Sequence, residues 1–309
     1  MKNKNNKLPI GLIFIRWAFK NLEKTLPWLA NRWAVKLFFT PIHFPEPEAE
    51  KKMAITGSGF TLKHKGKNIR GYYWGQGPVV VLLHGWSGRG LQFFQFITKL
   101  VDNGYRAVTF DGPAHGKSDG KTTDLLEYSE VIAMVANKFG DINSLVGHSF
   151  GGVAALYTIR EGLSVNNLVM ISSPTIAEDI VREFLNKING SPKVGLFFKN
   201  YFFKKFGKDF DSFSARALAE DIKDLPILLI HDEEDREVPI QHPLLFQEVK
   251  PEAKLIRTTG LGHTRILKDA KVIDETISFI NKNNNFNQDP ITDKSYTLFV
   301  DAEGSFEPF

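Results

Sequence analysis

The sequence predicts an α/β protein built on a mostly parallel, doubly wound sheet of about eight strands, and three observations lead to this prediction. Short, continuously apolar runs such as 78–85 indicate buried strands, because a half-exposed strand would alternate. Longer runs such as 124–140 carry apolar residues at helical spacing. The two kinds of segment alternate from residue 78 to residue 281, which is typical of a parallel sheet with helices on both faces.

The elements follow in a regular order after an antiparallel hairpin at 60–75, which we expect at the N-terminal edge of the sheet. Each strand is bounded by turn residues, and each helix carries one apolar face. The further strands are expected at 78–85, 105–112, 142–149, 166–174, 225–232 and 253–260, and the helices between and after them at 91–104, 124–140, 150–160 and 267–281.

Two stretches interrupt this rhythm. Residues 175–225 contain no buried strand but hold eight of the 26 phenylalanines, as expected of a helical lid inserted into the core. The run "NKNNNFNQDP" from residue 281 is polar. The chain therefore divides into an N-terminal amphipathic helical extension (1–50), an α/β core (51–174 and 226–285), the lid (175–225) and a C-terminal tail (286–309).

Composition excludes several classes of function. The chain has no cysteine, which rules out a disulfide scaffold, a thiolate nucleophile and a zinc site with sulfur ligands. Its histidines show no helical pairing with carboxylates, so we expect no metal. The net charge of +4 does not argue for nucleic acid. The sequence "HGKS" lacks the glycine that a phosphate-binding loop requires five residues before Gly116.

The N-terminal segment 8–40 leaves two interpretations open. Its apolar start is interrupted by Arg16 and is shorter than the roughly 20 residues of a spanning helix, and no cleavage site follows. We therefore expect a cytoplasmic protein. Trp17, Trp28 and Trp33 beside lysines and arginines suit a helix at an anionic membrane surface, possible at the inner face of the membrane. The alternative is that this apolar face packs on the core or the lid.

The stretch "LVGHSFGG" places Ser149 where a predicted strand meets a predicted helix. A nucleophile on such a corner needs a strained backbone that exposes its hydroxyl, and the crowding of strand and helix admits only tiny residues two positions on either side. Gly147 and Gly151 occupy those positions. The pattern therefore indicates a reactive serine.

A serine hydroxyl needs a base, and the base needs an orienting acid. His263 follows the last strand in a glycine-rich loop, at the edge of the sheet where Ser149 is expected. Asp235 is the first choice for the acid, because it lies far enough past its strand to turn back, and Asp232 is the second. The acid candidates in the loop after 225–232 are Asp232, Glu233, Glu234, Asp235 and Glu237.

Two backbone N–H groups are expected to bind the oxyanion of the tetrahedral intermediate. One belongs to Phe150, directly after the serine, and the other to Trp86, in the turn after strand 78–85. His84, His115 and His148 lie in tight turns, and we expect them to pack rather than to transfer protons.

The chain resembles the α/β-hydrolase superfamily from about residue 53 to residue 281. Its motifs stand in family order as "LLHGWSGRG", "FDGPAHGKSDG", "GHSFGG", "HDEEDREVP" and "GLGHT". The resemblance implies Ser149 as nucleophile, Asp235 as acid, His263 as base, and Trp86 with Phe150 as oxyanion donors. It also implies that 175–225 is the lid. One departure is Ala114, where the family has glycine in a loop of structural importance.

The function expected from these residues is hydrolysis of a carboxylic ester or thioester through an acyl-enzyme, without cofactor or metal. The phenylalanine-rich lid favours a small-molecule substrate with an apolar acyl or aromatic group. The same residues also serve C–C bond hydrolysis, acyl transfer or peptide cleavage, because a fold does not select among them. A non-catalytic binding protein is the remaining alternative, and an intact set of Ser149, Asp235 and His263 argues against it.

Overall fold

The computed structural model describes residues 10–284, so the tail expected at 286–309 lies outside the described part. The chain divides into two compact units. We call Pro41–Thr175 with Ala215–Phe309 the core unit, and Met1–Thr40 with Ile176–Ser214 the helical unit. The N-terminal helices and most of the expected lid thus form one unit, whereas the sequence led us to expect two separate segments.

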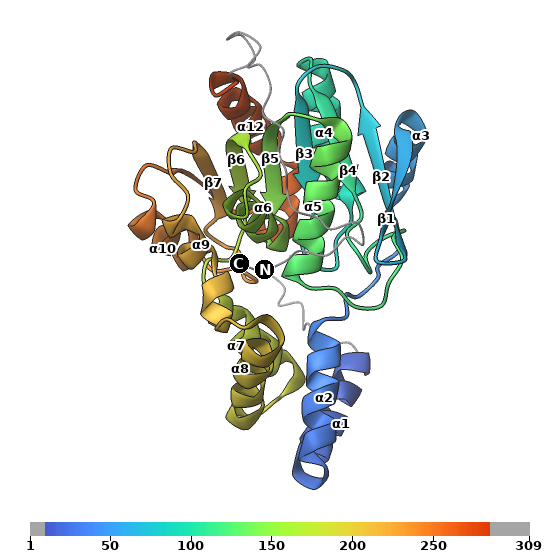
Figure 1. The fold of residues 1–309 in the computed structure, drawn as a ribbon, viewed down its shortest axis with the longest axis vertical. Coiled ribbons are helices and arrows are strands. Elements are labelled where there is room, and N and C mark those ends of the chain that lie inside the picture. The colour runs from blue at the N-terminus through green and yellow to red at the C-terminus, as the bar shows by residue number, and fades with distance from the viewer. Residues whose placement is uncertain (1–9, 285–309) are drawn as a thin grey trace, which may run out of the picture. The chain divides into compact units, whose positions relative to one another are not determined.

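The core unit contains an eight-stranded sheet in the order β1-β2-β4-β3-β5-β6-β7-β8 (Figure 1). The hairpin β1–β2 is antiparallel and lies at one edge, and every pair from β4–β3 to β7–β8 is parallel. The predicted fold class is therefore confirmed. The strands are β1 (Ser58–His64), β2 (Lys67–Trp74), β3 (Val79–Leu83), β4 (Arg106–Phe110), β5 (Ile142–His148), β6 (Val165–Ile171), β7 (Ile227–Asp232) and β8 (Lys254–Thr258).

Helices cover both faces of this sheet, because the central strands bury residues on both sides. In β3, Val81 and Leu83 face one buried cluster, whereas Val80 and Leu82 face the other. The first face packs on α5 (Leu125–Phe139), α6 (Phe150–Arg160), α9 (Ala215–Glu220) and α10 (Gln241–Val249). The second face packs on α3 (Glu48–Thr56), η1 (Gly90–Phe93), α4 (Phe94–Asp102), η3 (Ile266–Lys268) and α12 (Ala270–Lys282).

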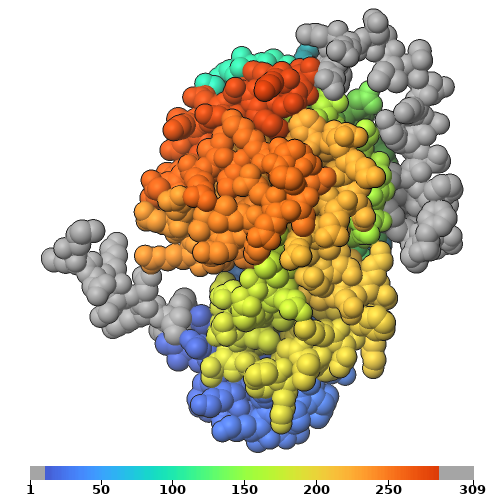
Figure 2. All heavy atoms as spheres, turned by 90° about the vertical axis from the view of Figure 1, so that its left-hand side faces the viewer, coloured from blue at the N-terminus to red at the C-terminus, as the bar shows by residue number. Residues whose placement is uncertain are grey.

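The helical unit has an apolar core of its own. It consists of α1 (Ile10–Thr25), α2 (Pro27–Phe38), α7 (Ala177–Ile188), α8 (Pro192–Phe206) and η2 (Phe210–Phe213). Phe38 lies at its centre, with ring centroids 5.1 Å from Phe184 and 5.3 Å from Phe198. Figure 2 shows the blue α1–α2 segment in contact with the yellow-green segment that follows β6.

This core bears on two expectations. The N-terminal helices pack one apolar face on α7 and α8, as the second interpretation of segment 8–40 required. Phe198 and Phe202 are buried in the same cluster. Their rings therefore stabilise the helical unit and are not free to line a substrate pocket, so the phenylalanine content of 175–225 is not by itself an argument about substrate.

Buried histidines hold the loops at the carboxyl edge of the sheet. His84 Nε2 accepts the Gly112 N–H at 2.8 Å, and its Nδ1 lies 2.8 Å from the Gly85 carbonyl oxygen. His115 Nε2 accepts the Ser87 N–H at 3.0 Å. Each ring uses one nitrogen as acceptor, so only a neutral imidazole satisfies both contacts. Burial lowers the pKa of His84, and it lowers the pKa of His115 from 6.5 to about 4.

These shifts predict acid sensitivity. Because the unfolded chain binds the proton more readily, the free energy of unfolding should fall between about pH 6.5 and about pH 4, by at most about 1.4 kcal/mol per pH unit for His115. His115→Gln, which does not titrate, should reduce that slope. Urea unfolding at a series of pH values measures it, and equal slopes in the two proteins would contradict the prediction.

Candidate active site

Ser149 lies on a strained corner between β5 and α6, with φ 52° and ψ −122°. The corner is crowded: a Cβ on Gly147 would lie 2.4 Å from the Gly152 Cα, and one on Gly151 would lie 2.2 Å from the Leu83 carbonyl oxygen. Both positions therefore require glycine. The strain is located at the residue that the sequence indicates as the nucleophile, and it directs that side chain away from the strand.

The turn after β3 approaches this serine closely. A Cβ on Gly85 would lie 2.9 Å from the Ser149 Cβ, so Gly85 too has no room for a side chain. Trp86 follows directly, and its ring centroid lies 5.4 Å from that of Phe150. Neither the Trp86 nor the Phe150 N–H donates a hydrogen bond to another residue between 10 and 284. The structure thus brings both expected oxyanion donors to the corner.

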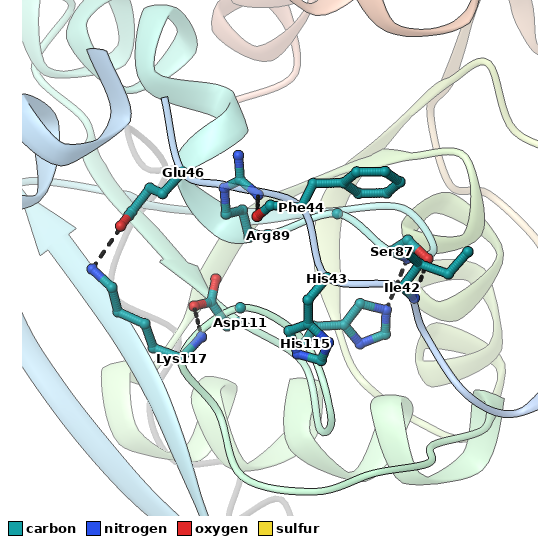
Figure 3. A pocket seen from close by; sticks show the side chains of 11 residues that line it. Ile42, His43, Phe44, Glu46, Ser87, Arg89, Asp111, His115 and Lys117 are labelled. Atoms are coloured by element: carbon teal, nitrogen blue, oxygen red, sulfur yellow. Dashed lines mark hydrogen bonds and ion pairs between the residues drawn. The ribbon is translucent and has the colours of Figure 1, made fainter. Parts of the chain in front are cut away.

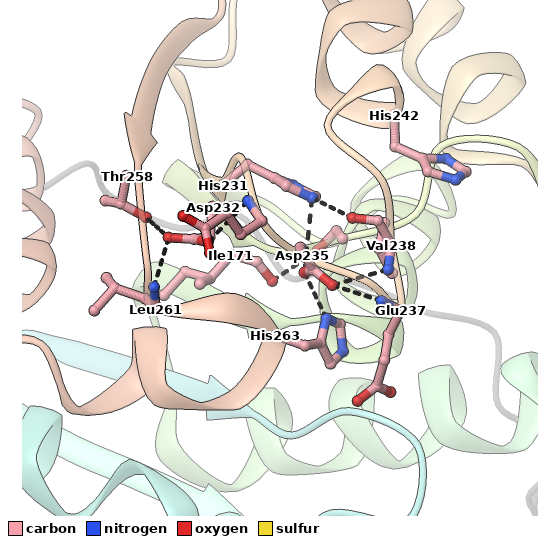
Figure 4. A network of polar contacts seen from close by, with 12 residues as sticks. Ile171, His231, Asp232, Asp235, Glu237, Val238, His242, Thr258, Leu261 and His263 are labelled. Carbon is pink, nitrogen blue, oxygen red and sulfur yellow. Dashed lines mark hydrogen bonds and ion pairs between the residues drawn. The ribbon is translucent and has the colours of Figure 1, made fainter. Parts of the chain in front are cut away.

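His263 and Asp235 meet from two different loops (Figure 4). Asp235 Oδ2 accepts a hydrogen bond from His263 Nδ1 at 2.7 Å. Asp235 Oδ1 accepts the N–H groups of Glu237 and Val238, both at 2.9 Å. Burial alone would raise the pKa of Asp235, but the hydrogen bond from His263 together with the two backbone donors lowers it. An ionised Asp235 fixes the ring through Nδ1, as expected of the acid that orients a base.

Asp232, the second choice, has a different role. Its carboxylate accepts the Thr258 hydroxyl at 2.8 Å, the Leu261 N–H at 3.0 Å and the Glu234 N–H at 3.0 Å. It therefore ties the loop after β7 to the loop that carries α11 (Gly262–Arg265) and His263. Sequence reasoning missed this role, although an aspartate at a strand end commonly accepts a hydrogen bond from the backbone N–H two residues on, as Asp232 does from Glu234.

His148 links the serine corner to the base. Its Nε2 lies 2.8 Å from the His263 carbonyl oxygen, and the two ring centroids are 4.8 Å apart. Burial, followed by the charge of His263, lowers the pKa of His148 to about 3. A neutral His148 therefore donates its Nε2–H to the loop of His263. Because His148 immediately precedes Ser149, this bond keeps the expected base close to the expected nucleophile.

The N-terminal strap, which we define as residues 41–50, is fastened to the turn that carries Trp86 (Figure 3). The Ile42 N–H donates to Ser87 Oγ at 2.9 Å. Arg89 forms a buried ion pair with Glu50 and donates to the carbonyl oxygens of Phe44 and Pro45 at 3.2 and 3.1 Å. No sequence pattern indicated these contacts, because they join segments about forty residues apart.

Beside the strap lies a pocket of about 90 Å³ lined by residues of the strap, of the turn after β3 and of the loop after β4. Asp111 holds that last loop by accepting the N–H groups of Gly90 and Lys117 at 2.9 and 2.8 Å. Ala114, which replaces the family's glycine, adopts φ 62° and donates to the Asp119 carbonyl oxygen. The loop thus tolerates alanine in a backbone region that glycine prefers. Within residues 10–284 no cluster of three or more histidines and carboxylates is placed to hold a metal ion.

Comparisons with known proteins show the family to which the chain belongs. Residues 80–275 match the profile of the alpha/beta hydrolase family. The non-heme chloroperoxidase CPO-A1 of Kitasatospora aureofaciens is 26% identical over 241 residues, which cover 62% of this chain and 86% of the relative. The pimeloyl-[acyl-carrier protein] methyl ester esterase of Xanthomonas campestris pv. campestris is 35% identical over 99 residues, which cover 32% of this chain and 38% of the relative.

A solved structure shows the same fold. The esterase EaEST from Exiguobacterium antarcticum superposes with a TM-score of 0.58 at 19% identity, covering 72% of this chain and all of that one. The family profile spans more than half of the sequence and includes the serine corner and the two loops that meet at His263. The chain therefore belongs to the alpha/beta hydrolase family and is an enzyme of the hydrolase class.

Proposed function

We propose that the protein is a serine hydrolase that cleaves a carboxylic ester or thioester through an acyl-enzyme on Ser149. The observation that carries the proposal is the 2.7 Å contact between His263 Nδ1 and Asp235 Oδ2. The proximity to Ser149 is supported by His148, the residue before Ser149, which bonds to the His263 carbonyl oxygen. A nucleophile, a base and an orienting acid are the three groups that acyl transfer to serine requires.

In the first half of the reaction, Ser149 Oγ attacks the substrate carbonyl carbon while His263 Nε2 takes its proton. The new oxyanion accepts hydrogen bonds from the N–H groups of Trp86 and Phe150, each worth about 3–4 kcal/mol in the transition state. The tetrahedral intermediate then expels the alcohol or thiol, which takes the proton from His263. Asp235 stabilises the imidazolium in between and remains ionised.

In the second half, water attacks the acyl carbon of the acyl-enzyme and gives a proton to His263. The same two N–H groups bind the oxyanion again, and Ser149 leaves with the proton from His263. All of these groups belong to the chain, so the scheme draws on no cofactor or metal. C–C bond hydrolysis, acyl transfer and peptide cleavage are possible with the same groups. Ester hydrolysis is preferred here because a methyl ester esterase is among the relatives.

The substrate proposed is a small molecule with an apolar acyl or aromatic group. The support comes from the core unit, where the half-buried rings of Trp86 and Phe150 pack edge to face beside Ser149. Aromatic rings at this place favour an acyl chain over a charged group, because burying a charge without a partner is costly.

Ser149→Ala should lower kcat/KM for p-nitrophenyl esters by about 10⁴-fold or more, because the remaining groups have no atom to acylate. Ser172→Ala is the matched control: Ser172 is a buried serine that also has positive φ, at the end of the neighbouring strand β6. The control should retain activity within a few-fold. A Ser149→Ala protein with the activity of the control would refute the assignment.

Asp235→Asn and Asp232→Asn should separate the roles of the two aspartates. Asp235→Asn removes the charge beside His263 and should lower kcat by about 10⁴-fold. Asp232→Asn disturbs hydrogen bonds between two loops, so it should lower the free energy of unfolding by about 1–3 kcal/mol with less than about tenfold loss of kcat. Steady-state kinetics and urea unfolding test both, and the reverse pattern would assign the acid to Asp232.

The acyl preference is tested with p-nitrophenyl esters of increasing chain length. We expect kcat/KM to rise from acetate to longer acyl chains, by up to about fourfold per added methylene, because each fully buried methylene contributes about 0.8 kcal/mol. Phe150→Ala keeps the backbone N–H but removes the ring, so it should flatten the series without abolishing activity. A wild-type series that is flat or favours acetate would contradict the proposed substrate class.

A further inference from the structure

The hairpin of α1 and α2 exposes a large apolar surface. We call Ile13, Phe14, Trp17, Leu26, Trp28 and Leu29 the apolar surface of the hairpin; their side chains are between 37% and 64% exposed. The first three share one face of α1, where the Phe14 and Trp17 rings lie 6.1 Å apart, and the last three lie at the turn into α2 and in its first turn. Large apolar side chains that are exposed together in this way mark a binding surface.

These exposed residues are not needed to complete the apolar core of the helical unit. The opposite face of α1, with Phe19 and Leu22, already packs on the other helices, and so do Ala30 and Ala34 of α2. Each helix therefore has one apolar face that is buried and further apolar residues that are exposed. A helix that only packed on its neighbours would carry polar residues at the exposed positions.

Basic residues share the exposed faces. Lys20 and Lys24 follow Trp17 by three and seven residues along α1, and Arg32 and Lys36 follow Trp28 by four and eight residues along α2. All four are exposed, and none forms an ion pair within the described part of the chain. Helical spacing places each pair below its tryptophan on the same face.

The one acidic residue in the first forty does not weaken this positive charge. Glu23 is half-buried and accepts hydrogen bonds from the hydroxyl and the N–H of Ser191, the residue directly before α8. It is therefore used inside the helical unit. The exposed faces of the hairpin combine tryptophan, phenylalanine and aliphatic side chains with cations alone.

The charge of the whole chain is divided in the same way. The helical unit contains 15 lysines and arginines against six acids, whereas the core unit contains 24 against 29. A formal charge of +9 thus lies in the unit that carries the apolar surface, and −5 in the unit that carries the candidate active site. The helical unit thus combines a positive charge with an exposed apolar surface, and such a surface favours a partner that is both anionic and apolar.

A lipid bilayer with anionic headgroups has both properties. No helix among the described residues is long and apolar enough to cross a membrane. The 16 residues of α1 extend about 24 Å, less than the ~30 Å of a hydrocarbon core. Helices with exposed tryptophans and a basic polar zone lie in the plane of the interface, with their apolar side chains below the headgroups.

We propose that the α1–α2 hairpin docks the protein on the surface of a membrane that contains anionic phospholipid. Trp17, Phe14 and Trp28 insert at the boundary of headgroups and acyl chains. Lys20, Lys24, Arg32 and Lys36 contact the lipid phosphates. Docking is independent of the proposed chemistry, so the Ser149→Ala protein binds vesicles as the wild type does.

The test is co-sedimentation of the full chain with vesicles. We expect binding to vesicles of phosphatidylcholine and phosphatidylglycerol in equal amounts, weak binding to phosphatidylcholine alone, and a decrease with added salt. The double variant Trp17→Ser, Trp28→Ser should bind at least about tenfold more weakly. The double variant Lys20→Gln, Lys24→Gln should weaken the preference for phosphatidylglycerol, because Arg32 and Lys36 remain, while retaining the fold by circular dichroism.

Ile55→Ser is the matched control, because Ile55 is 84% exposed but lies on α3 in the core unit. It should bind as the wild type does. The proposal is overturned if the tryptophan variant and the control bind equally, or if the wild type does not prefer phosphatidylglycerol. It is also overturned if neither the wild type nor the tryptophan variant binds vesicles and the wild type is a dimer that the tryptophan substitutions convert to a monomer. That result would assign the surface to a second copy of the chain.

Discussion

The crossing of β5 and α6 against β3 is the constraint on which the candidate site depends. Gly147, Gly151 and Gly85 each sit where a single Cβ would overlap neighbouring atoms, so strand, helix and turn approach to backbone distance. That approach forces Ser149 to a positive φ. It also brings the turn after β3 close to Ser149 at the start of α6, where the proposed oxyanion donors Trp86 and Phe150 follow Gly85 and Ser149.

Neutral histidines and buried carboxylates then hold the loops around that point. His84 and His115 fix the loops after β3 and β4, His148 fixes the loop of His263, and Asp232 ties that loop to the end of β7. Most of these groups are buried, where a hydrogen bond is strong but a polar atom that has lost its partner is costly. The same bonds that align the site therefore make it sensitive to acid, because a proton on any of these rings replaces an acceptor by a donor.

The sheet and the serine corner were predictable because their signals are local. Continuous apolar runs identify β3 and β5, and two glycines at fixed spacing identify the corner at Ser149. The choice of acid was less certain, because Asp232 and Asp235 share one loop and only their hydrogen bonds separate them. The role of Asp232 and the bond from His148 to the loop of His263 depend on the folded loops, and no pattern in the sequence encodes them.

The sequence left open whether the N-terminal helices pack on the lid, and it could not indicate α7 and α8 as their partners, for a related reason. Phe38 and Phe198 are 160 residues apart, and an apolar residue carries no information about which partner it meets. The contacts of the strap were not predictable either, because the ion pair of Arg89 with Glu50 joins residues that β1, β2 and β3 separate in the sequence. Both features are contacts between segments far apart in the sequence. The local sequence of each segment indicates only an amphipathic helix or an irregular stretch, and not its partner.

The central claim is that Ser149 Oγ is the atom that becomes acylated. Its most direct test is to treat the wild-type protein with a fluorophosphonate, digest it and locate the adduct by tandem mass spectrometry. The account predicts one stoichiometric adduct, on the peptide that contains residue 149 and on the serine itself. An adduct on any other residue, or no adduct in a protein that hydrolyses esters, would contradict it.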